Sequence, residues 1–178
     1  LADREGRFCE KIFDNVSLLN NTTVKHENVH LICSSLWSFI SLEHSWRIQH
    51  SLSDFRAIKY NKSRFSIEAY NQNHKSCLSF IESELERLQG EKTVVATHHV
   101  PTFLNYPEEY KGDALNEAFA VELFNLIENY QPNYWIYGHT HRNTPTFQIG
   151  ETSLVTNQLG YVQLGEHTTF ERGKNFEL

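Results

Sequence analysis

Several common features are missing from this sequence of 178 residues. It contains no methionine, so we expect that translation began before Leu1 and that an N-terminal part is not included. Nothing in it resembles a secretory signal or an apolar stretch of roughly eighteen residues. Lys and Arg form no long run and number 16 against 22 Asp and Glu, a net charge of −6. We therefore expect no nucleic-acid or anionic-membrane partner.

Cysteine is also scarce. Cys9, Cys33 and Cys77 are odd in number and form no metal-type doublet, which favours reduced cysteines in a cytoplasmic protein. The 39% hydrophobic and 13% aromatic content is that of a globular chain. No repeat, low-complexity stretch or linker divides it, so we expect a single domain over residues 1–178.

The apolar pattern predicts a mixed α/β fold. We expect helices at residues 5–15, 74–89 and 113–130, the last capped by Asp113. Strands are expected at residues 29–33, 93–97, 134–137, 144–149, 153–156 and from 163 onward. Residues 38–73 are irregular and rich in aromatics, which indicates either a structural excursion with its own small core or a binding loop.

Two histidine pairs follow predicted strands. His98 and His99 end one strand, and His139 and His141 follow Gly138 after the next. A strand, a helix and a strand at this spacing favour a right-handed parallel crossover, which places His98 and His139 at the same sheet edge. Open α/β sheets hold ligands at that edge.

The spacing of these histidines fits metal binding. With ten histidines in the chain, a His-x-His pair arises by chance about 0.6 times, so position rather than the pair itself carries the signal. On an extended chain His139 and His141 project to the same side, where each could bind one of two metal ions about 3.5 to 4 Å apart. The alternative is that they are hydrogen-bonded histidines at strand ends. His99 points away from His98 in an extended strand, so we expect it to support the site or the fold.

Two segments together carry a resemblance to a known family. Val-Val-Ala-Thr-His-His-Val-Pro at residues 94–101 and Trp-Ile-Tyr-Gly-His-Thr-His at residues 135–141 resemble the calcineurin-like metallophosphoesterase superfamily, more narrowly a bacterial branch of Ser/Thr protein phosphatase-like proteins. Weaker similarities at residues 36–38, 53–55, 110–119 and 157–161 extend the resemblance over nearly the whole chain. Gln158 and Leu159 stand where the branch commonly has Pro and Arg.

The resemblance implies part of a metallophosphoesterase β-sandwich flanked by helices. It implies that His98 and His139 bind one divalent metal ion and His141 the other, the ions being Mn, Fe, Ni or Zn. In the family, Asp-x-His, Gly-Asp and Gly-Asn-His-Asp/Glu motifs precede these segments, and nothing before His98 in this sequence matches them, so the histidine that acts on the leaving group is absent as well. We therefore expect a chain that lacks its N-terminal strands, has partial or no metal occupancy and is inactive or nearly so.

The implied reaction is phosphate-ester hydrolysis by a metal-activated hydroxide. The substrate would be a phosphorylated small molecule or a phosphoprotein, with His99, Arg142 and Asp113 as candidates for substrate contact or support. One alternative is a mononuclear zinc hydrolase with three histidine ligands and an open water position. Another is a degenerate, non-catalytic binding module in which the aromatic segment 37–70 contacts a partner.

Loss of the family's first strands would expose backbone groups at a sheet edge. We therefore expect a homo-oligomer that buries this edge. A monodisperse monomer in light scattering would count against that expectation.

Overall fold

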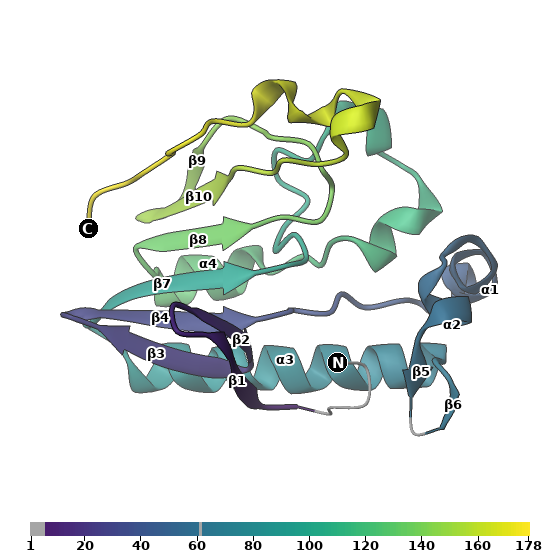
Figure 1. Ribbon diagram of the computed structural model, residues 1–178, viewed down its shortest axis with the longest axis horizontal. Coiled ribbons are helices and arrows are strands. Elements are labelled where there is room, and N and C mark those ends of the chain that lie inside the picture. The colour runs from purple at the N-terminus through teal and green to yellow at the C-terminus, as the bar shows by residue number, and fades with distance from the viewer. Residues whose placement is uncertain (1–5, 61) are drawn as a thin grey trace.

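The computed structural model describes residues 6–60 and 62–178 as a mixed α/β fold around one six-stranded sheet (Figure 1). Its strand order is β3-β4-β7-β8-β10-β9, and two further sheets pair β1 with β2 and β5 with β6. The strands are β1 (Phe8–Phe13), β2 (Val16–Asn20), β3 (Thr22–His26), β4 (Val29–Ser34), β5 (Lys59–Tyr60), β6 (Ser63–Arg64), β7 (Lys92–Thr97), β8 (Tyr134–Tyr137), β9 (Phe147–Ile149) and β10 (Thr152–Thr156). The α-helices are α1 (Leu42–Ser51), α2 (Asp54–Ala57), α3 (Ile67–Arg87) and α4 (Phe124–Tyr130), and the 3-10 helices are η1 (Glu108–Tyr110), η2 (Ala114–Ala118), η3 (Val162–Leu164) and η4 (Glu166–Thr169).

The four central strands β4, β7, β8 and β10 are parallel. The register pairs Ser34 with Thr97 and Thr156 with Tyr137, so the strands end level with one another at one edge of the sheet. This confirms the predicted parallel arrangement of the two strands that precede the histidines. It also confirms the mixed α/β class, since β3 and β9 run antiparallel to their neighbours. The two-sheet sandwich implied by the resemblance goes beyond this sheet and stays a prediction.

The main core lies between the sheet and helices α3 and α4, which pack against one another. Helix α3 begins seven residues before the predicted start, because Ser66 caps it by accepting a hydrogen bond from the Ala69 N–H (3.2 Å). Its apolar side chains recur at three and four residue steps and face the core. Trp135 of β8 is fully buried, and its indole N–H donates to the Thr97 hydroxyl (3.0 Å). None of the helices within the described ranges is long and apolar enough to cross a bilayer.

Residues 38–73 form α1, α2 and the β5–β6 pair around a second, smaller core. The aromatic rings of Phe55, Phe65 and Tyr70 pack against one another there. This confirms the interpretation of the segment as a structural excursion with its own core.

Three predicted elements are wrong. Glu5 lies outside the described residues, and the rest of segment 5–15 belongs to the β1–β2 hairpin region rather than to a helix. Residues 113–130 form η2 and α4 instead of one helix, because Val100 pairs with the backbone on both sides of Ala120. From residue 163 the chain forms η3, η4 and an irregular tail rather than a strand.

The buried face of β10 provides a test of the core. Leu154 is fully buried, and Leu42 of α1 is 93% exposed. Leu154→Ala should lower the free energy of unfolding by about 2–5 kcal/mol because it leaves a cavity, whereas Leu42→Ala should change it by less than about 0.5 kcal/mol. Urea denaturation measures both, and equal losses would contradict the described core.

Candidate functional site

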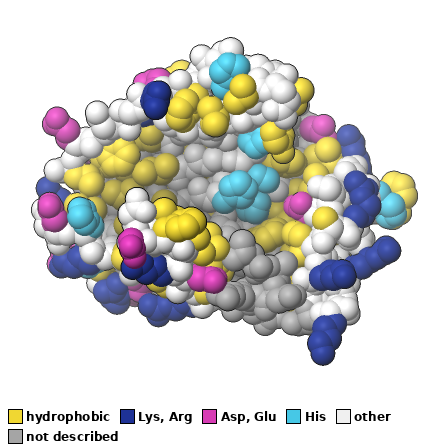
Figure 2. Space-filling view, viewed as in Figure 1, with side chains coloured by type: hydrophobic (Ala, Val, Ile, Leu, Met, Phe, Trp, Pro, Cys, Tyr) yellow, Lys and Arg dark blue, Asp and Glu magenta, His cyan; other side chains and the backbone are white. Residues whose placement is uncertain are grey.

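A cleft of about 600 Å³ opens at the edge where the parallel strands end. His98, His139 and His141 all line it, as the sequence predicts. In the space-filling view, histidine side chains gather in a hollow of the visible face (Figure 2). The other lining groups include three carboxylates, Asp54, Asp113 and Glu166, and several aromatic rings.

His98 and His139 are the central pair of this cleft. Their ring centroids lie 4.4 Å apart, because β7 and β8 are neighbours in the sheet and each histidine follows its strand closely. His99, the next residue, is buried and does not line the cleft. It is 4% exposed, donates from Nδ1 to the Leu36 carbonyl (2.8 Å) and places its ring 4.5 Å from that of His139. The buried ring of His99 thus contacts that of His139 and is bonded to Leu36, and its supporting role in a site stays a prediction.

The imidazole of His139 is held on two sides. Its ring stacks on Phe119 with centroids 4.5 Å apart, and the Ala118 carbonyl accepts a hydrogen bond from it. Burial, followed by the neighbouring His98, lowers the pKa of His139 to about 3. The ring is therefore neutral at ordinary pH, with one nitrogen engaged by the backbone and a lone pair available on the other. Metal-binding histidines commonly show this second hydrogen bond.

The backbone at the motif is strained. His139 (φ 78°) and His141 (φ 57°) both have left-handed backbone conformations, and so does the buried Leu36 (φ 47°) that accepts the bond from His99. Each such conformation costs roughly 1–3 kcal/mol for a residue with a side chain, and such residues concentrate at functional sites. An extended chain, the conformation expected from the sequence, is thus not what the motif adopts, although glycine is the residue that tolerates positive φ most readily. Instead the histidines adopt positive φ, and Gly138 is not among the positive-φ residues.

His141 is positioned by residues that the sequence argument did not assign. Its Nδ1 is 3.1 Å from Glu166 Oε2, and its backbone N–H donates to Gln158 Oε1 (2.7 Å). Hydrogen bonding, from the Tyr161 backbone first and from His141 next, lowers the pKa of Glu166, so it is a carboxylate at neutral pH. Gln158 was noted only as a departure from the family pattern. Glu166 lies 25 residues beyond His141, and no motif marks it.

The remaining candidates have structural partners. Asp113 lines the cleft, but its carboxylate caps η2 through the Leu115 N–H (3.0 Å) and contacts Arg47 (3.2 Å). Arg142 is exposed and donates from Nε to Glu109 Oε1 (2.8 Å). Both side chains are thus held by ion pairs, and their contact with a substrate stays a prediction.

The donor set bears on metal binding. Two neutral imidazoles, those of His98 and His139, converge, and the carboxylates of Asp54 and Glu166 face the same cleft. Within residues 6–60 and 62–178, no group of three His, Cys, Asp or Glu side chains lies close enough together to hold a metal ion. The paired imidazoles fit two positions of a coordination sphere that needs further donors.

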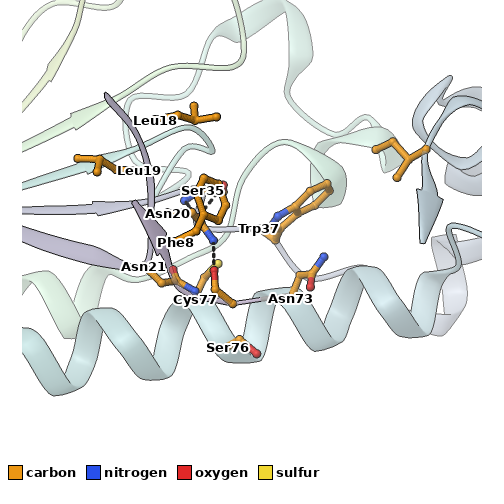
Figure 3. Close-up of a pocket in the computed structure, with 12 residues that line it drawn as sticks. Phe8, Leu18, Leu19, Asn20, Asn21, Ser35, Trp37, Asn73, Ser76 and Cys77 are labelled. Carbon is orange, nitrogen blue, oxygen red and sulfur yellow. Dashed lines mark hydrogen bonds between the residues drawn. The ribbon is translucent and has the colours of Figure 1, made fainter. Parts of the chain in front are cut away.

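A second pocket, of about 330 Å³, lies between the β1–β2 hairpin and α3 (Figure 3). Phe8, Trp37 and Cys77 contribute to its mainly apolar lining. Asn20 accepts hydrogen bonds from both the backbone N–H (2.8 Å) and the hydroxyl (2.9 Å) of Ser35. These bonds anchor the segment that includes Leu36, so this pocket contributes to the support of His99.

Comparisons with known proteins give little functional information. No family model matches the chain. The uncharacterized protein L509 of Acanthamoeba polyphaga mimivirus is 33% identical over 165 residues, which cover 86% of this chain. The chain spans 57% of the length of that relative. Among solved structures, TT1561 of Thermus thermophilus aligns with 78% of this chain and 48% of its own, at 14% identity and a TM-score of 0.38.

The buried histidines predict acid sensitivity. Burial lowers the pKa of His74, His99 and His139 below the ordinary value of 6.5. Below pH 6.5 the unfolded chain therefore binds protons that the folded chain does not, and stability should fall as the pH drops toward 4.5, before carboxylates contribute. Thermal unfolding across this range measures the effect. A melting temperature that stays constant between pH 6.5 and about 5, or that falls as the pH rises above 6.5, would contradict it.

Proposed function

We propose that this chain carries the histidine side of a dinuclear, metal-dependent phosphoesterase site. The observation that supports it best is the pairing of His98 with His139 at the carboxyl edge of the sheet. In addition, His139 and His141 have strained, left-handed backbone conformations. Strain of this kind persists where the surrounding structure fixes it, and here hydrogen bonds to Ala118 and Glu166 do so.

In this proposal His98 and His139 hold one divalent ion and His141 the other, the ions being Mn, Fe, Ni or Zn. When bound, such ions activate water and polarise the phosphoryl oxygen. The chain's own contribution is to orient the imidazoles: Ala118 fixes the ring of His139, and Glu166 fixes that of His141. The bridging carboxylate that two close cations require is not among these three histidines, so the chain alone should bind metal weakly or in part.

The proposed substrate is a phosphorylated small molecule or a phosphoprotein whose phosphate enters the cleft. Asp113 lies at the rim, where it can meet the part of the substrate that carries the phosphate. We also propose a cytoplasmic location, since Cys9, Cys33 and Cys77 are all free.

Metal binding can be tested without enzymatic activity. Adding Mn²⁺ or Zn²⁺ should raise the melting temperature, because a ligand at about 100 times its Kd stabilises the native state by about 2.7 kcal/mol. His139→Gly should abolish this shift while relieving the backbone strain, since glycine adopts positive φ without penalty. His26→Ala is the control, because His26 is exposed on β3. An equal metal-induced shift in His139→Gly, or no shift in the native chain with either ion, would overturn the proposal.

A further inference from the structure

A basic surface lies beside the histidine cleft. Residues 42–64 contain five of the 16 Lys and Arg and two of the 22 Asp and Glu, so this segment has a net charge of +3 in a chain with a net charge of −6. All five cations are exposed, and we call them the basic corner: Arg47, Arg56, Lys59, Lys62 and Arg64. Figure 2 shows Lys and Arg side chains on the right of the hollow, where Figure 1 places α1, α2 and the β5–β6 pair.

Two of these cations face one another. Lys59 of β5 and Arg64 of β6 are direct partners across the strand pair. Like charges in this position destabilise a two-stranded pair. Helix α2, which carries Arg56, packs against β6 and brings a third cation to the same side of the fold. An anionic group bound here would convert a repulsive arrangement into an attractive one.

The basic corner is continuous with the rim of the cleft. Arg47 Nη2 lies 3.2 Å from Asp113 Oδ1, which joins α1 to η2 across the rim. Leu52, which follows α1, and Asp54 of α2 both line the cleft. A ligand held at the basic corner can therefore extend into the cleft that contains the histidines.

Apolar side chains accompany the charges. Leu42 is 93% exposed and Trp46 is 71% exposed, and their spacing of four residues places them on the same face of α1. The indole of Trp46 stacks on His50 with ring centroids 4.4 Å apart, which holds it in place on the surface. Large exposed apolar groups beside cations are typical of a surface that binds a partner with both acidic and apolar residues.

We propose that the basic corner binds an acidic segment of a phosphoprotein substrate, with Trp46 and Leu42 receiving an apolar residue of that segment. This inference rests on the proposed phosphoesterase function and selects the phosphoprotein among its substrates. Charge complementarity favours a short acidic segment. A nucleic-acid duplex or a membrane surface extends beyond the basic corner and would bring its negative charge against the rest of this acidic chain.

Fluorescence anisotropy of the full chain tests the binding surface. The probe is a short fluorescein-labelled peptide with one phosphoserine flanked by Asp and Glu and followed by leucine. Lys59→Glu/Arg64→Glu should weaken its binding about tenfold, since each reversal replaces an attraction by a repulsion. The matched control is Lys25→Glu/Lys92→Glu, the same charge change at exposed residues near the opposite end of the β4 and β7 strands, which should have less than about a twofold effect.

Further arms separate this inference from the metal proposal. Trp46→Gln should weaken peptide binding about fivefold, since an exposed aromatic anchor is lost without disturbing the core. The unphosphorylated peptide should have the same affinity for His139→Gly as for the native chain, because it does not need the metal site. Peptide binding therefore tests the basic corner even if the metal proposal fails. Equal losses in the two charge-reversal variants, or tighter binding of a DNA oligonucleotide or of anionic vesicles than of the peptide, would overturn the proposal. A neutral peptide with Asn and Gln in place of Asp and Glu that binds equally well would do the same.

Discussion

The carbonyl oxygen of Ala118 connects the two cores of this protein. It accepts a hydrogen bond from the Tyr70 hydroxyl (3.0 Å), which belongs to the smaller core, and another from the imidazole of His139 at the cleft. Ser38 completes the chain of hydrogen bonds by donating to the same Tyr70 oxygen (2.6 Å). A carbonyl inside a continuous α-helix is already paired with the helix backbone. The end of η2 at Ala118 therefore frees the acceptor that orients His139.

The strained positions share this dependence on their surroundings. Leu36 lies in the loop after β4, and His139 and His141 share the loop after β8, yet hydrogen bonds join each of them to a neighbouring element. Three left-handed residues together oppose folding by several kcal/mol, roughly 1–3 kcal/mol each. The large parallel sheet and its helices supply the stability that offsets this. The sheet thus allows a locally unfavourable backbone arrangement to persist at its edge. Functional residues commonly lie in loops that a rigid scaffold positions in this way.

Sequence patterns predicted the scaffold well and the site only in part. The β-branched run before His98 and the apolar run before His139 defined adjacent parallel strands, because burial on both faces leaves a clear signal. The helix through residues 113–130 was wrong because its apolar period continues across the break, which is imposed by the distant Val100 backbone. Positive φ at His139 and His141 had no local signal in the sequence. Gly138, the neighbour that tolerates positive φ most readily, does not adopt it. Glu166 was missed because it had no local signal either: its contact with His141 depends on how the last part of the chain folds back.

That fold-back also sets an order of events during synthesis. The ribosome delivers β7 and β8 before the residues of η4, so the strands that carry His98 and His139 can pair while His141 still lacks its carboxylate partner. Only after Glu166 has emerged can His141 make its contact with that carboxylate. The site of His141 is therefore completed later than the strands at the centre of the sheet, although the histidine follows directly on one of them.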